Sequence, residues 1–280
     1  MSKNKKFKDL TIRDNFMFSA VMMQEDNCKR FLEMLLGIKI KEIDVSYERS
    51  IIYNPECKGI RLDVYASDDN NTRYNIEMQV AEQKLGKRIR YYHSQMDMEL
   101  LEKGQKYKEL PTSYVIFICN FDPYKMGRYC YTFEKLCVEE KGLKLGDDSV
   151  SIVLSTEGKN DDVPKELKDF LKFIKNDNSD NNSKTDNEYV RQLQRSIRSV
   201  KENRKWEHSF MTLEEIKNEA VEENLKECTL DILSELGDIP KEIEEIVMAE
   251  FRMDRLKAML RIAAKTTSFS DFKESLYCLE

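Results

Sequence analysis

The spacing of hydrophobic residues changes several times along the chain, and the first segments predict helices followed by a strand. Apolar residues recur at steps of three and four over residues 16–21 and 28–36, which is typical of amphipathic helices. Gly37 follows the second segment and fits the left-handed residue that commonly ends a helix. From Ile43 onward apolar and polar residues alternate, which predicts a half-buried strand.

A β-hairpin is predicted next. Residues 60–67 and 73–80 both alternate, and the segment 68–72, Asp-Asp-Asn-Asn-Thr, supplies the turn-forming residues between them. If the hairpin is centred on Asn70, opposed residues have numbers that sum to 140. The alternation then places one set of side chains on each face of the hairpin.

The following segments complete an α/β pattern. Residues 84–106 carry apolar side chains at helical steps, whereas residues 113–120 are almost continuously apolar, as in a strand covered on both faces. Two further β candidates, 129–133 and 149–154, precede a helix at 164–174. The order α-β-β-β-α-β, with trailing elements, predicts an α/β fold.

The last third of the chain reads as helical. Residues 175–187 contain no apolar residue and cannot contribute to a core. Beyond them, helical patterns cover residues 188–200, 213–236, 240–249, 252–264 and 269–276, and Thr212 with Glu215 matches a capping box for the second of these. We therefore expect a domain at 1–175, a flexible polar linker at 176–187 and an all-helical module at 188–280.

Charge and composition narrow the function classes. The 280 residues include 46 Lys and Arg against 52 Asp and Glu, so the net charge of -6 does not favour nucleic-acid binding by overall attraction. No apolar run is long enough to span a bilayer and no signal-like apolar segment follows the N-terminal lysines, so we expect a cytoplasmic location without membrane contact. His93 and His208 alone cannot supply a three-histidine zinc site.

Two acidic residues of the hairpin form the candidate site. In the predicted register Asp63 stands opposite Glu77, with Cβ atoms about 4.5–5.5 Å apart. Two like charges in that arrangement are destabilising, so a cation is expected between them, and Mg²⁺ suits carboxylate ligands completed by water and a substrate phosphate. The alternative is that both face solvent as ordinary strand residues, bridged to Arg61.

These motifs resemble a known nuclease family. Asp63 on one strand, Glu77-Met78-Gln79 on the next and a helix containing residues 88–95 resemble the PD-(D/E)XK nuclease superfamily. More narrowly, they resemble the Rpn group of recombination-promoting nucleases, also labelled PD-(D/E)XK family transposases, and the opening segment 14–18 looks like the start of that group. The resemblance covers about residues 9–133 and implies a restriction-endonuclease-like core.

The resemblance also implies roles for individual residues. Asp63 matches the metal-binding aspartate and Glu77 matches the acidic residue of the (D/E)-x-K element. Gln79 stands where the superfamily usually has lysine, so it can position water by hydrogen bonds but supplies no positive charge. Asp14 matches an accessory acid, with an N-cap role as the alternative. The implied cofactor is Mg²⁺, or Mn²⁺, and the implied partner is DNA.

The helix after the hairpin gives independent support. Residues 84–108 contain seven basic and three acidic residues in an otherwise acidic chain. On this helix Arg88, Tyr92 and Gln95 are the expected DNA contacts, and a solvated charged face is the alternative. His93 is either a general base or, more simply, a packing residue.

Two functions follow from the sequence. The leading hypothesis is a metal-dependent DNA endonuclease that acts in recombination, mobile elements or phage defence, with Asp63, Glu77 and Gln79 as catalytic residues. The alternative is a weak or inactive nuclease-fold protein that acts as a DNA-binding or regulatory module. In either case the C-terminal helices are candidates for homo-oligomer formation.

Overall fold

The computed structural model describes residues 5–51, 60–176 and 186–277, and it divides the chain into two compact units, Met1–Trp206 and Glu207–Glu280. The strands are β1 (Ile43–Ile51), β2 (Ile60–Asp68), β3 (Arg73–Gln79), β4 (Ser113–Cys119), β5 (Cys130–Phe133) and β6 (Ser149–Ser155). The α-helices are α1 (Asn15–Met22), α2 (Glu25–Leu36), α3 (Gly86–Leu100), α4 (Lys165–Asn176), α5 (Glu188–Glu202), α6 (Arg204–Ser234), α7 (Lys241–Ala249), α8 (Met253–Ala263) and α9 (Phe269–Tyr277), and η1 (Phe7–Asp9) and η2 (Tyr107–Glu109) are short 3₁₀ helices.

All described strands join one mixed sheet in the order β1-β2-β3-β4-β6-β5. β1, β2 and β3 are antiparallel neighbours, whereas β3, β4 and β6 run parallel. In the hairpin Val64 pairs with Ile76 and Tyr65 with Asn75, so the predicted register is confirmed. The α/β fold class is confirmed as well.

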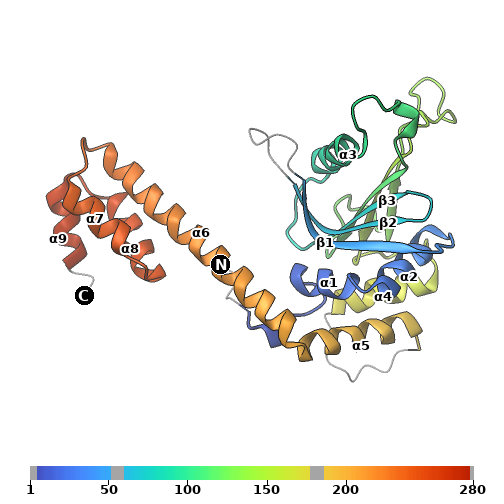
Figure 1. Ribbon diagram of the computed structural model, residues 1–280, viewed down its shortest axis with the longest axis horizontal. Coiled ribbons are helices and arrows are strands. Elements are labelled where there is room, and N and C mark those ends of the chain that lie inside the picture. Colours follow the sequence, from blue (N-terminus) through green and yellow to red (C-terminus); the bar gives the residue numbers. More distant parts are fainter. Residues whose placement is uncertain (1–4, 52–59, 177–185, 278–280) are drawn as a thin grey trace. The chain divides into compact units, whose positions relative to one another are not determined.

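Helices cover both faces of this sheet. α3 lies on one face, and α1, α2 and α4 lie on the other (Figure 1). On the α3 side, Ile89, Tyr92 and Met96 of the helix pack with Val115 and Phe117 of β4. Because the sheet is covered on both sides, Asp63 and Glu77 are buried instead of facing solvent, which removes the alternative of an ordinary exposed acidic pair.

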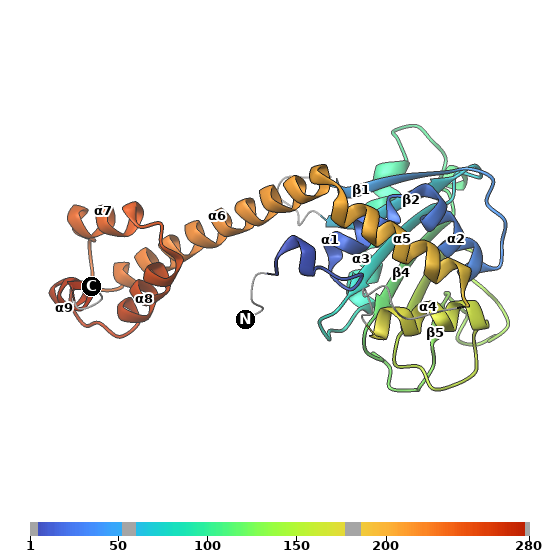
Figure 2. The same cartoon turned by 90° about the horizontal axis from the view of Figure 1, so that it is seen from below.

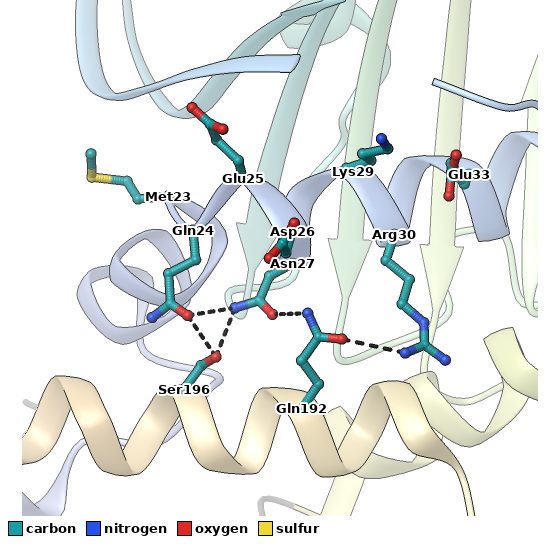
Figure 3. Close-up of a pocket in the computed structure, with 10 residues that line it drawn as sticks. All are labelled: Met23, Gln24, Glu25, Asp26, Asn27, Lys29, Arg30, Glu33, Gln192 and Ser196. Atoms are coloured by element: carbon teal, nitrogen blue, oxygen red, sulfur yellow. Dashed lines mark hydrogen bonds between the residues drawn. The ribbon is translucent and has the colours of Figure 1, made fainter. Parts of the chain in front are cut away.

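The helix α5 is part of the first unit. It lies over α1, α2 and α4, as Figure 2 shows from that side. Hydrogen bonds join it to the start of α2: Asn27 donates to Ser196 Oγ at 2.9 Å, Gln192 donates to Asn27 Oδ1 at 2.8 Å, and Ser196 donates to Gln24 Oε1 at 2.7 Å (Figure 3). The Tyr189 hydroxyl also donates to the Asn27 carbonyl at 2.9 Å.

The boundary between the units therefore differs from the expected one. The first unit continues past residue 175 to Trp206, because the amphipathic face of α5 packs on the first unit's helices. Most of the expected linker, residues 177–185, lies outside the described residues. The Trp206 ring meets Phe16 of α1 edge-on, with ring centroids 5.9 Å apart.

The second unit has its own helical core. Leu233, Val247, Leu256, Met259 and Phe272 are buried together with other apolar residues of α6 to α9. In the described part of the chain, no helix combines the length and apolar character needed to cross a membrane.

The structure corrects two predicted helix boundaries, the start of α6 and the end of α3. The capping box at Thr212 does not start a helix, because α6 begins at Arg204 and runs through that position without Gly or Pro to interrupt it. α3 ends at Leu100 instead of residue 106, ahead of Gly104, whose φ of 98° is incompatible with a continuing helix. Gly37 does end α2, with a left-handed φ of 67°.

Candidate active site

β2 and β3 bring Asp63 and Glu77 together beneath α3. The two residues are 6% and 1% exposed. The Asp63 backbone N–H donates to Glu77 Oε1 at 3.2 Å, and the Met78 N–H donates to Asp63 Oδ2 at 3.3 Å. Each carboxylate is thus held against the partner strand, and the two acidic groups adjoin as the hairpin register predicts.

The surroundings disfavour a negative charge on Glu77. Burial raises the pKa of this carboxyl group above its usual value of 4.5, and the neighbouring Asp63 carboxylate raises it further. Arg88 and the hydrogen bond from the Asp63 backbone N–H oppose these effects on the pKa without cancelling them. Additional positive charge beside Glu77 would therefore be stabilising.

Arg88 of α3 provides the nearby cation. Its Nη2 donates to Glu77 Oε2 at 2.7 Å, and its Nη1 donates to Gln79 Oε1 at 2.9 Å. Its Nε donates to the Tyr92 hydroxyl at 2.8 Å. The guanidinium carbon lies 5.0 Å from the centroid of the Tyr92 ring and 5.2 Å from that of Phe117. Arg88 therefore contacts the first and the last residue of the Glu77-Met78-Gln79 segment.

Gln79 is buried and its amide is directed by its neighbours. Its Oε1 accepts from Arg88 and from Gln83 Nε2, the latter at 3.0 Å. Its Nε2 donates to the carbonyl of Ala81. The oxygen of this amide is therefore turned toward cationic and amide donors, in the position where the resemblance would place a lysine.

The N-terminal segment contributes a residue that sequence reasoning did not single out. Asn15 Nδ2 donates to Asp63 Oδ2 at 3.3 Å. Asp14 instead accepts from the Thr11 backbone N–H at 2.8 Å and pairs with Lys5 Nζ at 2.8 Å, and it occupies the N-cap position of α1. The segment 14–18 was part of the resemblance, but its pattern did not indicate which residue would reach the acids.

The other α3 residues differ in what they offer to a ligand. Tyr92 and Gln95 are buried. Burial, together with the Glu77 charge, raises the pKa of Tyr92 to about 12, so its hydroxyl stays protonated. His93 is buried between Ser113 Oγ at 2.8 Å and Ser151 Oγ at 3.1 Å, and burial lowers its pKa to about 4. His93 is therefore a packing residue, which was the simpler of the two expectations.

Further basic side chains lie just before α3 and on its first turns. Lys84, Lys87 and Arg90 are exposed, and within the described residues none of them forms an ion pair. The Arg88 side chain pairs with Glu77 and is 34% exposed. The acids are thus buried beside one partly exposed cation, and further basic side chains on this part of the chain are exposed.

The donor set is compatible with a divalent metal. The described residues contain no group of three or more His, Cys, Asp or Glu side chains able to hold a metal ion. Asp63 and Glu77 supply two adjoining carboxylates, the hard oxygen ligands that Mg²⁺ and Mn²⁺ accept, and water and substrate oxygens can complete such a shell. The burial of both carboxylates, each beside the partner strand's backbone, is the observation that favours this fit.

A cavity beside α2 and α5 is not part of this site. It has a volume of about 860 Å³ and is lined by residues of α2, of α5 and of the turn before α2, which include Gln24, Asn27 and Gln192 (Figure 3). These polar groups bind one another in the network that attaches α5. The cavity is thus a feature of helix packing and is separate from Asp63 and Glu77.

Comparison with known proteins yields one family. The family model described as PD-(D/E)XK nuclease family transposase matches residues 13–226. The match includes every described strand of the sheet together with Asn15, Asp63, Glu77 and Arg88. No curated protein and no solved structure matches the chain.

Proposed function

We propose, from the premise that the chain belongs to the PD-(D/E)XK nuclease family transposases, that it is a metal-dependent DNA endonuclease. The observation that carries the proposal is the pair of buried carboxylates on β2 and β3, held beside a cationic side chain. A fold gains no stability from burying two adjoining acids unless they bind something positive. The proposed setting is the movement of mobile elements, recombination or defence against phage.

In this proposal Asp63 and Glu77 hold the metal ion. When bound, Mg²⁺ or Mn²⁺ would lower the pKa of water and neutralise charge on the phosphate. The Met78 N–H and the Asn15 amide orient the Asp63 carboxylate, since both donate to Oδ2. Arg88 keeps the Glu77 carboxylate turned toward the same space.

The reaction is hydrolysis of a phosphodiester bond. The oxygen of a water molecule bonds to phosphorus, and the bond from phosphorus to one ester oxygen breaks with its electron pair on that oxygen. The water gives up a proton to solvent and the leaving oxygen takes one up, so one water is consumed. Gln79, beside the acids, is the residue expected to position that water, through the one amide N–H that its hydrogen bond to the Ala81 carbonyl leaves available.

The exposed basic residues just before α3 and on its first turns would position the DNA. Lys84, Lys87 and Arg90 can contact phosphates, which fixes the path of the duplex without reading its sequence. Arg88, which pairs with Glu77, would be the basic residue of this helix in contact with the acids. Tyr92 and Gln95, which the sequence predicts as DNA contacts, are buried. In this proposal they would support the DNA-contacting residues from between α3 and the sheet.

Nicking of supercoiled plasmid tests the proposal. Wild type, Asp63→Asn and Asp44→Asn are compared with Mg²⁺, with Mn²⁺ and with a chelator. Asp44 is an exposed acid of β1 in the same sheet, so its substitution controls for loss of a charge. We expect metal-dependent nicking by wild type and Asp44→Asn, and a loss of about 100-fold or more in Asp63→Asn.

Two results would contradict this proposal. Equal nicking by wild type and Asp63→Asn would assign the activity to another site or another protein. Absence of nicking in all three, with DNA binding retained, would favour the alternative of a DNA-binding or regulatory module on a nuclease fold.

A further inference from the structure

The site lacks a cation at the strand position where the superfamily resemblance leads one to expect a lysine. Gln79 occupies that position and its amide is neutral. A hydrolytic site that builds negative charge on a phosphate needs a positive group near the reacting atoms. Either this chain works without one or another element supplies it.

The structure supplies a positive group from α3. Arg88 Nη1 binds the amide oxygen of Gln79 at 2.9 Å, and Nη2 binds Glu77 Oε2 at 2.7 Å. The guanidinium group therefore contacts Glu77 and also the side chain at position 79, where a lysine is expected. The separation of Arg88 from Gln79 is nine residues, so the contact comes from packing of α3 on β3 and not from the strand itself.

The position of the guanidinium is fixed on several sides. It lies against the Tyr92 and Phe117 rings, with its carbon 5.0 and 5.2 Å from their centroids, and Nε donates to the Tyr92 hydroxyl. The Arg88 side chain is 34% exposed, whereas that of Glu77 is 2% exposed. The cation thus touches a buried carboxylate and is itself partly open to solvent.

Arg88 retains hydrogen-bonding capacity for a ligand. A guanidinium has five N–H groups, and the hydrogen bonds to Glu77, Gln79 and Tyr92 use three of them. The remaining two belong to Nη1 and Nη2 and can donate to oxygen acceptors. Arginine remains charged even when partly buried, so this charge is permanent.

We propose that Arg88 is a catalytic residue that supplies, from α3, the positive charge missing from β3. Its remaining N–H groups contact the phosphate being cleaved and stabilise the negative charge that develops there. Gln79 and Tyr92 are positioning residues that aim the guanidinium. This inference rests on the proposed nuclease function, and it assigns Arg88 a role beyond general attraction of DNA.

Four variants separate catalysis from binding. They are Arg88→Met, Arg88→Lys, Arg90→Met and the double variant Gln79→Lys with Arg88→Met. Arg90 is the comparison because it is an exposed basic residue on the same helix. DNA affinity is measured by fluorescence anisotropy in chelator, and plasmid nicking is measured over a range of DNA concentrations with Mn²⁺.

The expected results depend on whether a positive charge lies beside Glu77 on β3. Arg88→Met lowers the nicking rate at saturating DNA by about 100-fold and changes DNA affinity little. Arg90→Met shows the opposite pattern, because it weakens DNA binding and raises the DNA concentration for half-maximal rate. The double variant regains at least tenfold over Arg88→Met, since the Gln79→Lys substitution restores a cation beside Glu77, and Arg88→Lys falls between wild type and Arg88→Met.

Thermal unfolding in chelator gives a readout that does not depend on activity. Arg88→Met leaves the buried Glu77 without its ion pair and lowers the unfolding temperature. The Gln79→Lys substitution in the double variant returns part of that loss, and Arg88→Lys retains most of the wild-type value. A variant that fails to fold is recognised here, and Arg88→Lys then carries the kinetic comparison.

The failures of the two proposals are distinguishable. If wild type nicks DNA and Arg88→Met nicks at the same saturated rate, the assignment of Arg88 is wrong and the nuclease remains. If Arg88→Met only weakens DNA binding, as Arg90→Met does, Arg88 is an ordinary DNA contact and its catalytic assignment is wrong. If folded wild type never nicks DNA, the nuclease proposal fails, and the catalytic assignment of Arg88 fails with it.

Discussion

Among the single residues of the site, Glu77 is a buried acid whose charge is only partly compensated. Burial and the Asp63 carboxylate raise its pKa, while Arg88 acts against them. An acid with a raised native pKa keeps a proton that the unfolded chain has already released. The cost of ionising it is what a bound divalent cation would remove.

Glu77→Gln tests this effect through the pH dependence of stability. Without metal, the unfolding free energy of wild type should fall as pH rises from about 4.5 through the raised pKa, because the native state then binds more protons than the unfolded state. Glu77→Gln lacks this component, so its profile should be flatter in that range. Loss of the ion pair between Glu77 and Arg88 changes the unfolding free energy of Glu77→Gln at every pH in this range, but it does not change how steeply that free energy depends on pH.

Urea unfolding in chelator across the acidic to mildly alkaline range measures both profiles. Glu82→Gln is the control, because Glu82 is an exposed acid close in sequence. Parallel profiles for wild type and Glu77→Gln would mean that Glu77 titrates near its ordinary value. That result would remove the electrostatic reason for a cation at this site.

Asn15→Asp adds a third carboxylate beside Asp63. Asn15 is exposed apart from its contact with Asp63 Oδ2, so the substitution should not disturb the core. We expect a lower unfolding temperature in chelator and a larger increase on adding Mg²⁺ than in wild type, because a bound cation is stabilised by the extra acid. Asn15→Ala, which loses the hydrogen bond without adding charge, should show no larger metal response; equal responses of the two variants would contradict the placement of Asn15.

The residue pattern revealed the acids but not the groups that hold them. Asp63 and Glu77 could be paired from the alternation and the turn, because a hairpin fixes its own register. The contacts from Asn15 and Arg88 join elements that are 48 and 11 residues from their acidic partners. Such contacts depend on how helices pack on the sheet, which a single sequence does not specify.

Among the helices and strands, α5 is held to the first unit by buried polar groups. Asn27 bonds to Ser196 and Gln192 of α5, and its Nδ2 also donates to the Val21 carbonyl at 2.8 Å. Asn27 itself is only 1% exposed. Ser196 is buried as well, so its hydroxyl group would lose a hydrogen bond where little water reaches it, whereas Gln192 is partly exposed.

Asn27→Ala should therefore destabilise the first unit by about 1–3 kcal/mol, the usual cost of leaving buried polar partners unsatisfied. Chemical denaturation with a far-UV signal measures the change. Asn218→Ala on the exposed face of α6 is the matched control and should be close to neutral. A cost near zero for Asn27→Ala would show that α5 is attached by its apolar face alone.

The elements differ in how far their sequences determine them. Alternation and turn residues identified β2 and β3 and their register, and Gly37 marked the end of α2. The extension of α6 back to Arg204 was missed because a capping box can also occur inside a continuous helix. α5 was assigned to the C-terminal module because an amphipathic pattern shows that a helix packs, but not on which core.

Over its full length, the chain joins a first unit, which lies within the family match almost entirely, to a helical second unit with a separate core. The family match ends at residue 226, within α6, so α7, α8 and α9 lie beyond it. Leu256, Met259 and Phe272 of the second unit are fully buried. Separate cores predict that one unit can be damaged while the other stays folded.

Phe272→Ala tests this independence. Removing a fully buried ring should cost the second unit about 3–5 kcal/mol. We expect faster proteolysis after residue 206 and an unchanged metal-dependent rise in the unfolding temperature of the first unit. Loss of the metal response would show that the units depend on each other.

Sedimentation of the same variant tests the predicted self-association, because unfolding these helices should release monomers from any oligomer that they form.

Binding of a divalent cation by Asp63 and Glu77 can be measured without any knowledge of the DNA substrate. The experiment is isothermal titration of Mn²⁺ into folded wild type and Asp63→Asn. We expect saturable binding to wild type that is lost, or weakened at least about tenfold, in Asp63→Asn. Equal Mn²⁺ binding by both proteins, or none by wild type, would contradict the proposal that these two acids hold a catalytic metal ion.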